Sequence, residues 1–428
     1  MNRSANLLLV IIICFACTRQ NKDQNSVTNP VRDPGSKSKI SRTSPLPPSL
    51  SSDVHPGKGF RSHKNKRNGP FLLPDQGIQT FSMNRDSAVV SLPRILREKD
   101  AELDLNEPTN RAILSSTIAP ADFPGMILLS RERFLKISFD NDIFDYTDRF
   151  YTNGVRIDLI HPSLSENPVT RISVPYWGHG MNYYGISLVQ NLYTPSTTKI
   201  GGIQYGDRPF AAYLYLASFK ITNDPQKRFR MTSEIDLGII GPYSLGEYMQ
   251  KSFHNALPSN SEPEGWEYQV QNDLVLNYSV TFDKGVINEP WMNVNLISTA
   301  ILGTLCTNIS GGVLARAGWM NPYFANLGIS KRSRLSQNHL RQFQGYFFVK
   351  GSTKLVGYDA TLQGGLLNRT SPYTLTGADV SRLVFQSSLG LAISFGGFEI
   401  EAEQFLLSPE FTGGSWHKWG HIGLTFCF

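Results

Sequence analysis

The sequence predicts an all-β fold, a twelve-stranded antiparallel transmembrane β-barrel, and three observations support this prediction. First, apolar and polar side chains alternate with a period of two residues in many segments between Phe134 and Phe428, with turn-forming residues between the segments. Second, this part of the sequence has no apolar run long enough for a transmembrane helix. Third, Tyr, Phe and Trp gather at the ends of the segments, as in the aromatic girdles of outer-membrane barrels. A soluble β-sandwich also shows such alternation, so it remains the alternative.

The predicted strands are even in number, as closure of a bacterial outer-membrane barrel requires. They cover residues 134–140, 151–161, 184–193, 211–221, 230–240, 268–283, 292–302, 309–317, 344–356, 381–395, 397–407 and 417–427. In the last of them, "HKWGHIGLTFCF", one face carries Ile422, Leu424 and Phe426. The chain ends on the aromatic Phe428, which is common in outer-membrane barrels.

One interior stretch, "GPYSLGEYMQKSFHNALP", predicts a short helix on the extracellular side of the barrel. Its apolar residues recur at a helical spacing of four: Leu245, Met249, Phe253 and Leu257. Pro258 limits the helix at its C-terminal end. Gln250 and His254 are also four residues apart, so they share one face of the helix.

The first 17 residues predict an export signal. Arg3 precedes an apolar run from Leu7 to Ala16 that is too short to span a bilayer. Cys17 after Ala16 resembles a bacterial lipobox, which would make the mature protein a lipoprotein lipidated at Cys17, although Cys14 departs from the usual pattern. A redox or zinc-binding reading of "CFAC" is disfavoured, because the motif lies inside the apolar signal.

Residues 18–125 predict a disordered N-terminal extension. Between Thr18 and Pro70 there are eleven Lys or Arg residues against three Asp, few large apolar residues, and many Ser and Pro. The formal net charge of +6 therefore arises from this extension, and the sequence gives no reason to expect a nucleic-acid partner. Contact of the basic segment with anionic lipid is an alternative to a plain tether. In 71–126 the stretch "SLPRILREKDAELDL" predicts a short amphipathic helix whose role the sequence does not define.

An acidic turn separates the first two predicted strands, in "SFDNDIFDYTDRFYTNGVRIDLI". Asn141 and Asp142 offer the hard oxygen ligands that calcium prefers. A turn whose side chains bond to their own backbone is the alternative.

Five stretches, taken in order, resemble the outer-membrane lipid A 3′-O-deacylase family. They are "NDIFDYTDRFYTNG" from Asn141, "QNLYTPS" from Gln190, "GDRPFAAYLYL" from Gly206, "GIIGPYSLGEYMQKSFH" from Gly238 and "PEGWEYQ" from Pro263. The resemblance covers residues 130–428 and implies a monomeric barrel in the bacterial outer membrane. It also implies a calcium-dependent hydrolase that removes an ester-linked acyl chain, of the 3′-acyloxyacyl type, from the lipid A of lipopolysaccharide.

The resemblance implies three catalytic residues. His254 would be the general base, a role that suits a side chain titrating near neutral pH. Lys199 would stabilise the oxyanion, although it stands about one residue nearer to the "YTP" than the family pattern expects. Thr152 matches a polar site position that orients metal ligands or a water molecule.

The resemblance also implies a Ca²⁺ site. Asn141 and Asp142 would be ligands, together with an acidic residue shortly after the histidine. We expect Glu262 in that place, while Glu264 stays open as an alternative, because the spacing does not choose between them.

Two other functions remain open from the sequence. One is a non-enzymatic outer-membrane barrel, porin-like or structural, and the other is a phospholipid acyl hydrolase with the same site. The sequence contains neither a G-x-S-x-G elbow nor an H-E-x-x-H motif, which argues against serine-esterase and zinc-protease chemistry.

Overall fold

The structure is a computed structural model that describes residues 127–142, 149–176, 178, 180–255, 262–330 and 340–428. The chain divides into Met1–Leu105 and Asn106–Phe428, and all described residues belong to the second unit. The predicted export signal 1–17, Cys17 and the predicted extension 18–125 lie outside the described residues.

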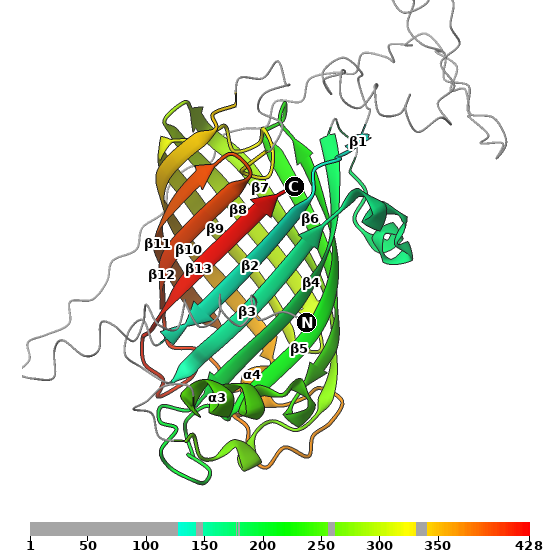
Figure 1. Ribbon diagram of the computed structural model, residues 1–428. Helices are drawn as coiled ribbons and strands as arrows, with labels where there is room; N and C mark the ends of the chain where they lie inside the picture. Colours follow the sequence, from blue (N-terminus) through cyan, green and yellow to red (C-terminus); the bar gives the residue numbers. More distant parts are fainter. Residues whose placement is uncertain (1–126, 143–148, 177, 179, 256–261, 331–339) are drawn as a thin grey trace, which may run out of the picture. The chain divides into compact units, whose positions relative to one another are not determined.

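Twelve strands of the described part form a closed antiparallel barrel, in which each strand pairs with its neighbours in the chain, β2 pairs with β13, and β4 pairs with β5 to complete the ring (Figure 1). The strands are β2 Phe134–Asn141, β3 Phe150–Ile160, β4 Gly180–Thr194, β5 Ala211–Asp224, β6 Phe229–Ile240, β7 Asp273–Glu289, β8 Met292–Gly303, β9 Cys306–Trp319, β10 Phe343–Asp359, β11 Leu383–Phe395, β12 Phe398–Leu407 and β13 His417–Cys427. The predicted fold is therefore confirmed, and the soluble β-sandwich is not.

One strand differs clearly from the prediction at both of its ends. The strand predicted at 268–283 is β7, which begins later and ends later, at Asp273–Glu289. The residues before it form the 3₁₀ turn η7 (Trp266–Tyr268), and the backbone N–H of Val270 donates to the carbonyl of Phe210. This segment is thus held by the neighbouring loop rather than by the barrel ladder.

A short strand that the sequence did not predict, β1 (Ile127–Leu129), precedes the barrel. It pairs in parallel with β4 at Gly180–Asn182, beyond the point where β3 ends at Ile160. β1 thus provides hydrogen-bonding partners for the first residues of β4, along the edge where β3 no longer pairs with β4.

The outward face of the barrel carries an apolar row that crosses seven strands. Paired residues along this row are Ile400, Leu424, Ile137, Ile157, Leu188, Leu216 and Leu237. Leu216 and Leu237 are 62% and 59% exposed, as expected for side chains that face hydrocarbon. This row belongs to the lipid-facing band of the barrel.

The inward face is polar and is crossed by ion pairs. Arg156 Nη2 lies 2.8 Å from Glu234 Oε2, and Lys136 Nζ lies 2.6 Å from Glu401 Oε1. Successive strand residues thus alternate between hydrocarbon outside and a charged lumen inside, which is the pattern of an outer-membrane barrel.

Residues 320–330, which follow β9, fold into the lumen near the end of the barrel that holds the C-terminus (Figure 1). Ile329 is buried among lumen side chains that include Phe134, and Arg230 of β6 donates to the carbonyls of Tyr323 and Asn326 at 2.9 and 2.8 Å. This filling argues against a wide aqueous pore of the porin kind.

The opposite end of the barrel carries the long connections 195–210, 241–272 and 360–382, and we assign it to the extracellular side. It holds η6 (Pro242–Ser244), α3 (Gly246–Asn255) and α4 (Ala360–Gln363), with both α-helices at the lower end in Figure 1. The helix predicted from "GPYSLGEYMQKSFHNALP" is α3. At the other end, the β3–β4 connection contains η4 (Pro162–Glu166) and η5 (Pro168–Ile172).

Among the described residues, no helix combines the length and the apolar character needed to cross a membrane.

Candidate active site

The outward face of the barrel changes from apolar to polar near the extracellular ends of β2 and β3. Asn141 pairs with Asn153, and Asn153 pairs with Leu192 of β4. Asn153 stands four residues before Ile157 of the lipid-facing row, so both side chains project from the same face. The amides of Asn141 and Asn153 thus lie on an outward surface that is apolar further along the same strands. Polar side chains at such a position indicate a functional site rather than a lipid contact.

Two threonine hydroxyls adjoin these amides. Thr152 lies at a bulge in β3, where the register with β4 shifts between Tyr151 and Asn153. Its Oγ1 lies 2.8 Å from Oγ1 of Thr194, and both side chains are buried. The bulge therefore turns Thr152 toward the outward-facing side chains of β4.

Helix α3 covers the neighbouring wall of β4 and β5 with its polar face. Gly246, Gln250 and His254 recur every four residues and are its buried residues. The helix packs on β4 and β5, and Gly246 approaches Ala212 so closely that an added Cβ would lie 2.2 Å from the Ala212 Cβ. His254 consequently lies on the side of α3 that faces the barrel, and it shares this face with Gln250, as their spacing predicted.

Two hydrogen bonds that involve glutamine side chains hold the helix in place. Gln190 on the outward side of β4 donates from Nε2 to the carbonyl of Ser244, two residues before α3, at 2.6 Å. Trp266 donates from Nε1 to Oε1 of Gln250 at 2.7 Å, while its ring packs with Leu192. Strand, helix and the following segment are therefore joined around the buried face that carries His254.

Asn141 and Asp142 stand at the end of β2, and both are buried. Oδ2 of Asp142 accepts a hydrogen bond of 2.8 Å from the backbone N–H of Arg149, across the acidic turn. A buried carboxylate next to a buried amide fits calcium, which takes six to eight oxygen ligands and readily adds carbonyls and water to a few side chains. The described residues contain no cluster of three or more His, Cys, Asp or Glu that could complete such a site from acidic side chains.

The two acidic candidates for the next ligand lie in different surroundings. Glu262 is exposed and its Oε1 lies 3.1 Å from Nζ of Lys251, which also pairs with Glu247 at 3.0 Å. These carboxylates, Glu247 first, raise the pKa of the Lys251 ammonium. Glu264 instead lies against the loop that follows β4, where its backbone N–H donates to the carbonyl of Thr198 at 2.8 Å. A calcium ligand from this segment stays a prediction, with Glu262 as first choice.

Lys199 is exposed in that same loop, next to the residue that binds Glu264. Its backbone N–H donates to Oγ1 of Thr197 at 3.2 Å. The structure therefore puts Lys199 at the extracellular end of the barrel, on the connection between β4 and β5, the two strands under α3.

The sequence interpretation missed three polar residues of this region, although two quoted motifs contain them. Gln190 and Thr194 belong to "QNLYTPS", and Asn153 belongs to "YTNG". The sequence pattern that could have identified them is a group of polar residues at the end of strand faces that are otherwise apolar and outward-facing.

Arg208 of "GDRPF" has a different position. It is 1% exposed, its Nη1 lies 3.1 Å from Oε2 of Glu410, and its guanidinium stacks over Tyr193 on the lumen side. It ties the β4–β5 loop to the β12–β13 connection, so we assign it a structural role.

Comparisons with known proteins concern the family and the fold of the chain. The family described as "Outer membrane protein LpxR" matches residues 111–428. Among solved structures, LpxR from Salmonella typhimurium is similar with 20% identity and a TM-score of 0.54, over 69% of this chain and 100% of that chain. The beta domain of the Bordetella autotransporter Brka has 9% identity and a TM-score of 0.36, over 69% of this chain and 99% of its own. A search of curated proteins gave no match.

The family match spans most of the chain, including every barrel strand. The solved LpxR structure has the same fold. The protein is thus an outer-membrane β-barrel, and it belongs to the LpxR family, the lipid A 3′-O-deacylase family that the sequence motifs resemble.

Proposed function

We propose that the protein is a calcium-dependent hydrolase that removes an ester-linked acyl chain, of the 3′-acyloxyacyl type, from lipid A. Family membership supports a lipid A deacylase in the outer membrane. The observation that carries the proposal is the position of His254. It is buried on the wall-facing side of α3, which packs on β4, and the outward face of β2–β4 becomes polar at this end.

The location suits a lipid substrate. The outward face of the strands contacts hydrocarbon, so an ester in the outer leaflet reaches a site on that face without leaving the membrane. A site in the lumen would require the lipid to enter a charged interior that residues 320–330 partly fill. All residues of the site come from one chain, so a monomer suffices.

In this proposal His254 takes a proton from the attacking water, and Thr152, oriented by Thr194, holds that water or the ester through its hydroxyl. Lys199 supplies positive charge where the oxyanion develops. Calcium, held by Asn141, Asp142 and an acidic residue such as Glu262, would supply polarisation of the ester carbonyl. Since each role depends on a side chain, each can be tested by substitution.

The test is product analysis with two substrates. The full-length protein is reconstituted with lipid A or with phospholipid, with added Ca²⁺ or with a chelator, and the products are analysed by mass. We expect lipid A to lose one acyl chain in the presence of Ca²⁺ only. Cleavage of phospholipid alone would establish the phospholipid hydrolase instead, and absence of any product would favour the non-enzymatic barrel.

A further inference from the structure

The apolar side of α3 faces away from the barrel. Tyr248 and Met249 lie on one flank of the helix and Leu245 immediately precedes its first residue, and these three side chains are 67%, 41% and 55% exposed. A short surface helix of a soluble protein would bury this flank and expose its polar one. Here the buried face is the polar one of Gln250 and His254, so the apolar flank needs another environment.

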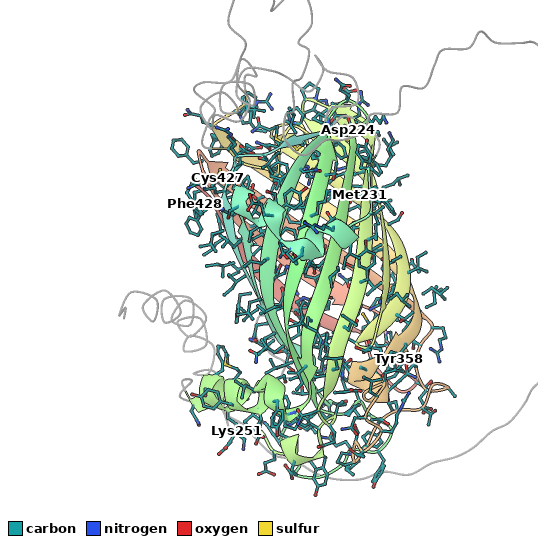
Figure 2. The ribbon with its side chains drawn as sticks, turned by 90° about the vertical axis from the view of Figure 1, so that its right-hand side faces the viewer. Asp224, Met231, Lys251, Tyr358, Cys427 and Phe428 are labelled. Carbon is teal, nitrogen blue, oxygen red and sulfur yellow. The ribbon has the colours of Figure 1, made fainter. Side chains whose placement is uncertain are left out.

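The remaining flank of α3 is charged. Glu247 and Lys251 are one turn apart and pair at 3.0 Å, and Glu262 adds a second carboxylate to Lys251 at 3.1 Å. Going around the helix, the buried face therefore separates a charged flank from an apolar flank. Figure 2 labels Lys251 at the lower side of the helix, toward the extracellular end of the molecule.

The apolar flank continues the lipid-facing surface of the barrel. Helix α3 packs on β4 and β5, the strands whose outward side chains include Leu188 and Leu216 of the lipid-facing row. In Figure 2 the helix projects sideways from the wall near the extracellular ends of the strands, rather than over the mouth of the barrel. Any lipid that surrounds the wall at this level also surrounds the helix.

We propose that α3 is an interfacial membrane helix, with Leu245, Tyr248 and Met249 in contact with acyl chains of the outer leaflet and with Glu247 and Lys251 in the aqueous headgroup region. A helix with a charged flank and an apolar flank lies in the plane of a bilayer with its apolar side about 5–10 Å into the boundary between headgroups and acyl chains. The exposed Tyr243 in η6, three residues before α3, suits the same depth, since tyrosine favours the membrane interface. The occupant of this surface is lipid rather than another protein, because the surface is continuous with the lipid-facing band. The proposal concerns membrane contact and goes beyond the proposed catalytic function.

Photocrosslinking tests the proposal directly. A diazirine-bearing amino acid replaces Met249 on the apolar flank or, as the matched control, Glu247 two residues earlier on the charged flank. Each full-length variant is reconstituted in phospholipid bilayers and illuminated, and lipid adducts are measured by mass. We expect most of the adduct at position 249 to be acyl chain and position 247 to form little or none. Equal yields at both positions, or no lipid adduct at position 249, would overturn the proposal.

A second measurement does not depend on crosslinking chemistry. A fluorescent amino acid is placed at the same two positions, and quenching by brominated acyl chains is compared with quenching by aqueous iodide. The proposal requires that bromolipid extinguishes most of the signal at position 249 and iodide most of that at position 247, and the reverse order contradicts it. Neither measurement requires catalysis, so a failure here is separate from a failure of the deacylase proposal.

Discussion

The hydroxyl oxygens of Thr152 and Thr194 lie 2.8 Å apart, and this contact joins the bulge of β3 to the last residue of β4. Either hydroxyl can be the donor. If Thr194 donates, the hydroxyl hydrogen of Thr152 is available to another group, and if Thr152 donates, its oxygen can still accept a hydrogen bond. The pair therefore fixes a polar group beside Asn153, on the outward face.

Replacing Thr152 by Val should slow deacylation, because the isosteric side chain keeps the volume and removes the hydroxyl. Loss of one such hydrogen bond is worth about 1 kcal/mol, which corresponds to roughly fivefold in rate. Thr152→Ser keeps the hydroxyl and should restore most of the rate, with heat-induced unfolding like the wild type, whereas the Val variant should stay folded but lose about 1–3 kcal/mol because Thr194 loses a buried partner. A Val variant as fast as the wild type would remove Thr152 from the site.

The close approach of Gly246 to Ala212 predicts a compensating pair of substitutions. In Gly246→Ala the new Cβ would lie 2.2 Å from the Ala212 Cβ, so α3 must move away from the wall. A shift of about 1 Å at a catalytic group lowers the rate by up to about a hundredfold. The double variant Gly246→Ala with Ala212→Gly exchanges the methyl group between the two surfaces and should recover activity. If the double variant is as slow as Gly246→Ala alone, the loss of rate does not arise from a displacement of α3 on β5.

Asp142 should control metal binding. Asp142→Asn keeps the size of the side chain and removes its charge, which weakens a site for a hard divalent cation. Calcium affinity, measured by calorimetry on the purified protein without substrate, should fall in this variant. Asp379→Asn is the matched control, because Asp379 lies in an extracellular connection where it accepts hydrogen bonds from Thr376. Equal affinity in the two variants would exclude Asp142 as a ligand.

Leu424 and Gln386 test the orientation of the barrel wall. Leu424 faces lipid, so Leu424→Lys should cost about 2–4 kcal/mol if it lies near the bilayer midplane. Gln386 lines a lumen cavity of about 370 Å³ that also contains Asp359 and Glu410, so Gln386→Lys should be tolerated. Unfolding by denaturant in lipid vesicles measures both effects. Equal costs for the two substitutions would contradict the assigned faces.

The strands were predictable from the sequence because two-residue alternation has a strong physical cause. Each strand separates hydrocarbon from a polar lumen, so Leu424 and its neighbours alternate along the whole length of the strand. The prediction was less accurate for β7, where Val270 continues the apolar pattern but bonds to Phe210 in the adjacent loop. The periodicity shows which side chains are apolar, but it does not show with which segment the backbone forms its hydrogen bonds.

The face of α3 shows a second limit of the sequence. The spacing of Gln250 and His254 correctly predicted one shared face. The spacing of Leu245 and Met249 predicted a helix but not that these residues are exposed. Apolar periodicity identifies a core-facing stripe only when water is the solvent, and beside a membrane the apolar stripe can face outward.

The choice between Glu262 and Glu264 depends on long-range packing and could not be read from spacing. Glu262 lies beside Lys251 of α3, and Glu264 lies on the loop that holds Lys199. Both are separated from Asp142 by more than a hundred residues, so only the closed fold determines which of them lies close enough to Asp142 to share the proposed Ca²⁺ site.

The most direct test of the central claim compares the rate of acyl-chain loss from lipid A in the wild type and in His254→Ala. Removal of a general base lowers a rate by about 10²–10⁴-fold, while the barrel keeps its heat stability because His254 lies on α3 outside the strands. His161→Ala is the control, since His161 begins the β3–β4 connection at the other end of the barrel. We expect full activity in His161→Ala and near-complete loss in His254→Ala. Deacylation at the wild-type rate in His254→Ala, or none in the wild type with Ca²⁺ present, would contradict it.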